Sequence, residues 1–170
     1  MTALPDIRLR AIEPEDLDLL YQIENDTRLW NVGTTNVPYS RYTLHDYIAC
    51  SNDDIYADRQ VRLVIETTDG QTVGIADLVR FDPQHQRAEI GIVIMNDYRR
   101  KGYAEKAVSQ MCRYALEVLH LHQLYAVIDE RNEAALKLFL KSGFQQTARL
   151  SDWLSSGHEY HDACLMQSFL

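Results

Sequence analysis

The stretch that decides the fold is Met95-Asn96-Asp97-Tyr98-Arg99-Arg100-Lys101-Gly102-Tyr103-Ala104. An apolar run with strand character, 90–94, leads into it, and its basic turn contains a single glycine. Beyond that turn, apolar residues recur at the 3.6-residue spacing of an amphipathic helix, namely Ala104, Ala107, Val108, Met111, Cys112, Ala115 and Leu119. The stretch therefore predicts a strand, a short turn and a long helix in direct succession.

The flanking sequence predicts further elements on both sides. Upstream, we expect a strand at 7–11, helices from Pro14 to about Asn25 and from the N-cap Ser40 to about Asn52, and an antiparallel meander of strands at 61–66, 71–81 and 87–95. Downstream, we expect a strand at 124–128, a helix that Asn132 caps and that ends at Ser142-Gly143, and strands at 144–154 and 159–169. The predicted order is β-α-α-β-β-β-α-β-α-β-β, an α+β or mixed α/β fold in one domain, 1–170.

Composition limits the class of protein. The chain has 170 residues, 46% of them hydrophobic and 25% charged, which fits one globular domain. Its 17 basic and 25 acidic residues give a formal net charge of −8, which argues against binding to nucleic acid and fits a cationic or neutral small substrate better. No secretory signal or membrane-length apolar run is visible, so we expect a soluble, cytoplasmic protein that does not bind a membrane. The cysteines are widely separated and the histidines lack a ligand spacing, so no metal site is expected.

The basic turn 99–104 predicts an anion site. Backbone N–H groups at a helix start have no partner inside the helix, and the helix dipole places positive charge there. Arg99, Arg100 and Lys101 add three full charges within a chain of negative net charge. A phosphate or pyrophosphate is the most plausible ligand. The alternative is a solubilising loop in which Gly102 merely relieves a tight turn.

Two motifs resemble those of one protein family. Residues 99–104 match the R/Q-x-x-G-x-G/A pyrophosphate loop of the GNAT superfamily of acyl-CoA-dependent N-acyltransferases. The stretch Asn132-Glu133-Ala134-Ala135 through Leu138-Phe139-Leu140-Lys141-Ser142-Gly143-Phe144 is similar to the family signature N-x-x-A-x-x-L-Y-x-K-x-G-F. The motifs are separated by one helix and one strand, as in the family, and the resemblance covers nearly the whole chain. Segments 87–90 and 125–132 look closest to diamine/spermidine N-acetyltransferases and are also similar to ribosomal-protein N-terminal acetyltransferases.

The resemblance implies a GNAT-like mixed, mostly antiparallel sheet flanked by about four helices, with acetyl-CoA as co-substrate. It implies that the backbone of Ile92, Val93 and Ile94 binds the pantetheine arm, and that Asn132 contacts the cofactor near its thiol end. It also implies that Ala135 and Phe139 pack beside the cofactor, and that the pyrophosphate is held by Arg99, Arg100, Lys101, Gly102, Tyr103 and Ala104. A simple N-cap role for Asn132 stays open.

Acetyl transfer to an amine requires a neutral nucleophile, although a free alkylamine has a pKa near ~10.4. A base or a desolvating pocket is therefore needed. Glu89, on the strand that precedes the predicted cofactor stretch, is the first choice for the base, and Asp77 on the strand before it is the second. Alternatively, Glu89 is a strand-surface carboxylate paired with Arg87 or a neighbour.

Phe139 departs from the family pattern, because many relatives carry a tyrosine there that can protonate the leaving thiolate. Transfer by a ternary complex to a small amine, such as a polyamine, is the main hypothesis. The alternatives are acetylation of a protein N-terminus, such as that of a ribosomal protein, and a catalytically weak CoA-binding module. We expect an acceptor pocket between 30–47 and the C-terminal strands, and a homo-oligomer is possible. Residues named for that pocket are Glu24, Asp26, Asp46, Trp153, His158 and Tyr160.

Overall fold

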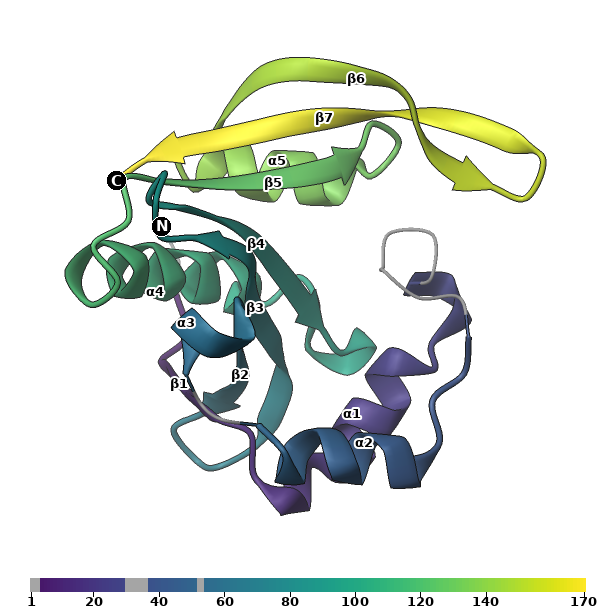
Figure 1. The fold of residues 1–170 in the computed structure, drawn as a ribbon, viewed down its shortest axis with the longest axis vertical. Coiled ribbons are helices and arrows are strands. Elements are labelled where there is room, and N and C mark those ends of the chain that lie inside the picture. The colour runs from purple at the N-terminus through teal and green to yellow at the C-terminus, as the bar shows by residue number, and fades with distance from the viewer. Residues whose placement is uncertain (1–3, 30–36, 52–53) are drawn as a thin grey trace.

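A single twisted sheet organises the part of the chain that the computed structural model describes, residues 4–29, 37–51 and 54–170. Its strand order is β1-β2-β3-β4-β5-β7-β6, and every neighbouring pair is antiparallel except β4 and β5 (Figure 1). The mixed, mostly antiparallel sheet predicted from the sequence is confirmed. The strands are β1 (Ile7–Ala11), β2 (Val61–Thr67), β3 (Thr72–Asp82), β4 (Arg87–Ile94), β5 (Gln123–Asp129), β6 (Gln145–Ser156) and β7 (Glu159–Phe169).

The helices follow the predicted order with one addition. Ser40 caps its helix as expected, its hydroxyl accepting a hydrogen bond from the Thr43 N–H at 3.0 Å. The added helix is α3, a single turn whose start is capped by the Asp54 carboxylate. The helices are α1 (Leu17–Glu24), α2 (Arg41–Ala49), α3 (Ile55–Asp58), α4 (Tyr103–Glu117) and α5 (Glu133–Lys141), with 3₁₀ turns at Pro14–Asp16, Thr27–Leu29 and Asn96–Tyr98. Five α-helices thus occupy the described ranges, where about four were expected.

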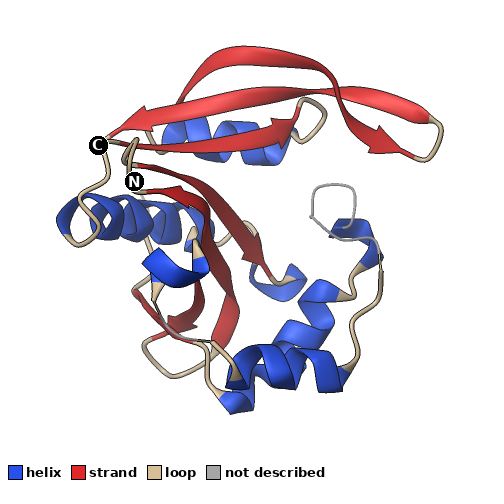
Figure 2. Ribbon diagram, in the orientation of Figure 1, coloured by secondary structure: helices blue, strands red, loops and turns tan. Residues whose placement is uncertain are grey.

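The two faces of the sheet carry different helices. Alternate residues of β3, β4 and β5 form the main core with the apolar stripe of α4, in which Val108 and Met111 are completely buried. A smaller cluster on the opposite face joins Leu19 and Ile23 of α1 to the sheet. Figure 2 shows α1 and α2 well apart from α4 and α5. The front of the sheet, the face that α1 covers, is therefore separated from the α4 face by the strands themselves.

An ion network fixes β1 to the first helical turn. The Arg10 guanidinium donates to both carboxylate oxygens of Asp16, at 2.7 and 2.9 Å, and also to Glu66. Both carboxylates are buried. Burial alone would raise the pKa of Asp16, but hydrogen bonds from Arg10 and from the Glu13 N–H hold that pKa below its ordinary value. The contribution of Asp16 to this network is therefore present only while its carboxylate is ionised.

In the described part of the chain, no helix is both long and apolar enough to cross a lipid bilayer.

Candidate active site

The sheet opens between β4 and β5, and this opening is the centre of the candidate site. The two strands pair over only three positions, 87–89 against 123–125. Beyond Glu89, β4 continues beside β3 to Ile94, whereas β5 continues beside β7 (Figure 1). We call the paired positions the seam. Past the seam, the β5-facing edge of β4 has no strand partner among the residues described, and Ile92, Val93 and Ile94 lie on that open edge.

Both α4 and α5 begin at this same end of the sheet, because β4 and β5 are parallel and each strand leads into one of them. Gly102 occupies the N-cap of α4 with a φ of 88°, a left-handed conformation that glycine adopts without strain. No side chain caps this helix in the described structure, so its first N–H groups remain available to an anion. A Cβ added to Gly102 would lie 3.0 Å from Pro5, so the turn is also tightly packed.

Side chains of the turn before α4 hold it in place. The Arg99 guanidinium donates to the carbonyl oxygen of Ile94 at 2.9 Å, and the Lys101 ammonium lies 5.5 Å from the ring centroid of Tyr98. Arg99, Arg100 and Lys101 are all exposed. Tyr103 contacts Tyr98 edge to face, and Ala104 packs partly against the main core. The structure thus brings the six predicted residues 99–104 together at one uncapped helix end.

The second predicted motif lies at the start of α5. The Asn132 side chain is exposed and accepts a hydrogen bond from the Ala135 N–H at 3.1 Å, so this residue does serve as an N-cap. Ala135 is half-buried. Phe139 is almost fully buried, with its ring edge to face against Phe144 at a centroid distance of 4.9 Å. The ring of Phe139 therefore contributes to the core, whereas Asn132 is open to a ligand.

Glu89 lies at the last paired position of the seam, opposite Tyr125. Its carboxylate is 18% exposed and accepts a hydrogen bond from Arg80 at 2.9 Å. Burial raises the pKa of Glu89 above its ordinary value, although Arg80 and the Val127 N–H partly offset that rise. A carboxylate with a raised pKa at the mouth of an opening is suited to accept a proton from a substrate. Its partner is Arg80 and not Arg87, which pairs with Asp82 instead.

Asp77 lies on the same face of the sheet, opposite Gly91 of β4. Arg62 donates to both of its carboxylate oxygens, at 2.9 and 3.0 Å, and also to Glu24 at the end of α1. Burial would lower the pKa of Arg62, but the charges of Asp77 and Glu24 raise it. Asp77 therefore acts in a charged clamp between α1 and the sheet, and Glu89 is the better placed of the two carboxylates for proton transfer.

Comparison with known proteins agrees with this geometry. Residues 6–145 match the family model of the acetyltransferase (GNAT) domain. The chain belongs to the GNAT acetyltransferase family. It is 31% identical to the spermidine N(1)-acetyltransferase of Escherichia coli K12, over 99% of this chain and 89% of that protein.

Solved structures share the fold. The spermidine N-acetyltransferase of Vibrio cholerae in complex with CoA and spermine superposes with a TM-score of 0.85 at 24% identity, over 96% of this chain and 95% of that one. A dodecameric structure of the Vibrio cholerae enzyme superposes with a TM-score of 0.77 at 23% identity, over 96% and 93% of the two chains. Family membership makes this chain an acetyltransferase with acetyl-CoA as its co-substrate.

Two cavities lie beside the sheet. One, of about 270 Å³, lies between the end of α1 and the end of β4, where Val93, Arg99 and Asp26 contribute to its walls. The other, of about 480 Å³, lies between α2, α3 and the start of β2, away from the α4 turn. The smaller cavity is thus the one that adjoins the residues predicted to hold the cofactor.

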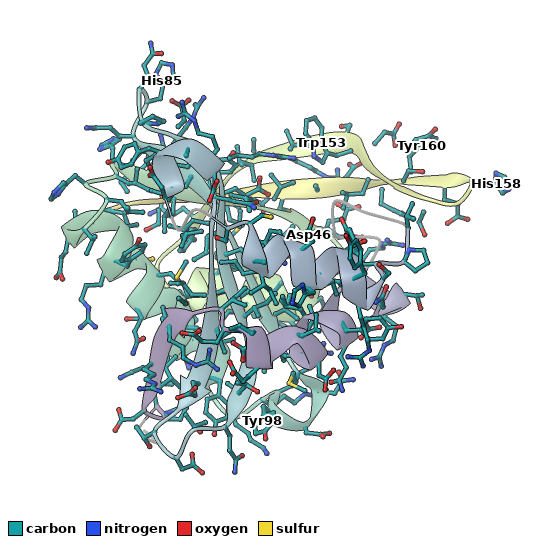
Figure 3. All side chains as sticks on the ribbon, turned by 60° about the horizontal axis from the view of Figure 1, so that its bottom comes forward. Asp46, His85, Tyr98, Trp153, His158 and Tyr160 are labelled. Carbon is teal, nitrogen blue, oxygen red and sulfur yellow. The ribbon has the colours of Figure 1, made fainter. Side chains whose placement is uncertain are left out.

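The predicted acceptor residues are only partly placed by the structure. Glu24 and Asp26 are each paired with an arginine, Arg62 and Arg28. Asp46 is exposed on α2, and Trp153, His158 and Tyr160 are exposed on the part of the β6–β7 hairpin that extends past the end of β5 (Figure 3). Residues 30–36 of the predicted pocket lie outside the described residues. Among those that are described, no group of His, Cys, Asp and Glu could hold a metal ion.

Sequence reasoning missed Arg80 and Arg62 as members of the site. Arg62 could have been predicted, because the pairing of β2 with β3 places it opposite Asp77 on the same side of the sheet. Arg80 could not have been predicted, because it reaches Glu89 through a β-strand irregularity that the residue types do not indicate.

Proposed function

We propose that this acetyltransferase transfers the acetyl group directly from acetyl-CoA to a primary amine, within a ternary complex, and that the amine is a polyamine such as spermidine. Similarity to the Escherichia coli spermidine enzyme supports the acceptor class. The negative net charge of −8 favours the approach of a polycation. The single observation that carries the proposal is the position of Glu89, at the point where β4 and β5 separate.

The residues present fit acetyl-CoA. The open edge of Ile92–Ile94 offers main-chain donors and acceptors to an extended pantetheine arm, as if to an added strand. The uncapped start of α4 and the three cations of 99–101 would hold the pyrophosphate. Asn132, at the start of α5, would contact the arm nearer its thiol end. When bound, the co-substrate supplies a thioester whose acyl carbon the amine nitrogen attacks.

The chain itself supplies the base and the orientation. The Glu89 carboxylate would accept a proton from the substrate ammonium, leaving the amine lone pair free. The raised pKa of Glu89 favours this step, because a more basic carboxylate is a better proton acceptor. Holding amine and thioester together supplies much of the remaining acceleration. Phe139 cannot donate a proton to the departing sulfur, so in this proposal the C–S bond breaks with CoA leaving as a thiolate that takes its proton from water.

Acetylation of a protein N-terminus is the second candidate. The observation in its favour is that Arg62 and Arg28 neutralise Glu24 and Asp26, two of the carboxylates predicted to attract a polycation. A pocket with less negative charge selects less strongly for several positive charges on one acceptor. The third possibility, a catalytically weak CoA-binding module, is motivated by Phe139.

A thiol-release assay with acetyl-CoA tests these functions together. Spermidine and spermine are compared with peptides that have free N-termini, in wild type and in Glu89→Gln. We expect turnover of the polyamines and a loss of roughly 10²-fold or more in Glu89→Gln. Turnover of peptides alone would replace the polyamine by a protein acceptor. Binding of acetyl-CoA with no turnover of any amine would leave only the CoA-binding module.

A further inference from the structure

The strand β3 is irregular just before its end. Its register with β4 shifts between Val79 and Asp82, so Arg80 and Phe81 form a β-bulge. Arg80 has a φ of 51°, a left-handed conformation that is unfavourable for a residue with a long side chain. Backbone strain of this kind is concentrated where function or packing requires it.

The bulge reverses the side of the sheet that each residue faces. In a regular strand, Arg80 would face the same side as Leu78, which is completely buried in the main core. Instead Phe81 occupies the core, 4% exposed and edge to face with Tyr56, while the Arg80 side chain is exposed. The irregularity therefore places the guanidinium on the side that carries Glu89.

Arg80 contacts the end of the seam through Glu89. Its Nη1 donates to Oε2 of Glu89 at 2.9 Å, and its charge lowers the pKa of Tyr125, in opposition to the effect of burial. Glu89 and Tyr125 are opposite each other at the last position where β4 and β5 pair. One side chain from β3 thus binds the last paired residue of β4, at the point where the sheet opens.

We propose that Arg80 is a positioning residue for acetyl transfer, which holds the Glu89 carboxylate at the mouth of the opening through their hydrogen-bonded ion pair. The proposal rests on the proposed function, because it takes Glu89 as the base. Arg80 itself does not contact the amine. Its role is to restrict the carboxylate to one position and to set how readily it gains a proton.

The groups that face Glu89 come from two strands. Arg80 approaches from β3, and Tyr125, opposite Glu89, lies with Val127 on the same face of β5. Burial raises the pKa of Glu89 and Arg80 lowers it. The carboxylate also raises the pKa of Tyr125, in addition to the effect of burial. Loss of the guanidinium therefore raises the pKa of Glu89 further.

Arg80→Asn is the variant that tests the proposal, because asparagine tolerates the left-handed conformation and the bulge is retained. The acid limb of the pH profile of kcat/KM moves to higher pH by about one unit, which is roughly a tenfold loss of activity below that limb. Arg80→Lys, which keeps the charge, recovers part of the shift. The matched control is Arg59→Asn, which removes an exposed arginine that is also left-handed, with a φ of 56°, and leaves the profile unchanged.

A direct measurement accompanies the kinetics. The carboxyl carbon of Glu89, assigned by its disappearance in Glu89→Gln, is titrated by ¹³C NMR in wild type and in Arg80→Asn. An upward shift of its pKa in the variant, with acetyl-CoA binding retained by calorimetry, supports the proposal. Identical titrations and pH profiles in the two proteins overturn it. If Arg80→Asn does not fold, Arg80→Gly, which also suits the bulge, takes its place.

The two proposals fail in different ways. Full activity of Glu89→Gln overturns the role of Glu89 as the base, and with it the role of Arg80. A large loss in Glu89→Gln together with a wild-type titration in Arg80→Asn overturns only the role of Arg80.

Discussion

Substitution of Gly74 by alanine tests how closely β3 and β4 approach each other. Gly74 lies opposite Ile94, and a Cβ on it would overlap the carbonyl oxygen of Val93 well inside 3.0 Å and lie 3.1 Å from the Ile94 Cα. Both obstacles are backbone atoms, so the strands must move apart. We expect a cost of about 3 kcal/mol, the upper part of the range for overpacked sites. For a domain of this size, that cost lowers Tm by roughly 6–12 °C.

Thermal unfolding by circular dichroism measures the effect, with Gly91→Ala as the matched control. Gly91 is on the neighbouring strand, and its added Cβ would lie 3.8 Å from the Asp77 Cβ, an ordinary contact. Relief of the entropic cost of glycine in a strand makes this control neutral or stabilising by up to about 1 kcal/mol. Equal Tm values for Gly74→Ala and Gly91→Ala would refute this reasoning, because they would mean that β3 and β4 can move apart at Gly74 at little cost in stability.

Three further variants test other parts of the molecule. Gly102→Ala places a Cβ at a left-handed N-cap that packs on Pro5, and the backbone strain costs about 1–2 kcal/mol. We expect acetyl-CoA binding to weaken by about tenfold, and unchanged affinity by calorimetry would contradict the anion site. Phe139→Tyr adds a hydroxyl to a buried ring and lowers stability by about 1–3 kcal/mol in urea unfolding, with turnover intact or raised; a sharp loss of turnover would show that packing of the phenyl ring is essential. Because the pKa of Asp16 is lowered in the fold, its contribution to stability is present above the unfolded pKa of about 4 and is lost as pH falls through the folded value. Asp16→Asn is therefore less stable at pH 7 and loses less on acidification than wild type; parallel curves between pH 7 and 3 would argue against the ion network.

The local spacing of apolar residues was sufficient to locate most of the helices and strands. Alternation of apolar residues located the meander, and the apolar stripe located α4 from Tyr103 to Glu117, within a few residues of the predicted limits. The short helix α3 was missed, because four residues carry no helical periodicity and its start depends on the Asp54 cap. Prediction from the sequence thus fails mainly for elements too short to show a period.

The candidate site also contains residues that the sequence predicts and residues that it does not. Gly102 and Asn132 were predictable because each lies at a helix start that the sequence marks. The partner of Glu89 was not predictable, because the left-handed conformation of Arg80 is set by the demand of Phe81 for a place in the core. The length of the seam was equally hidden. It depends on pairing between β4 and β5, which α4 separates in the sequence, and the residues of neither strand indicate where that pairing ends.

The short seam divides the sheet mechanically. Within the antiparallel block β1–β4 and within the block β5–β7, neighbouring strands pair along most of their length. Between the two blocks, only three residues of β4 pair with three residues of β5. A tensile load across that junction would concentrate on very few bonds. The two blocks are therefore joined chiefly by the apolar core that their buried residues share with α4, and only to a small extent by main-chain hydrogen bonds.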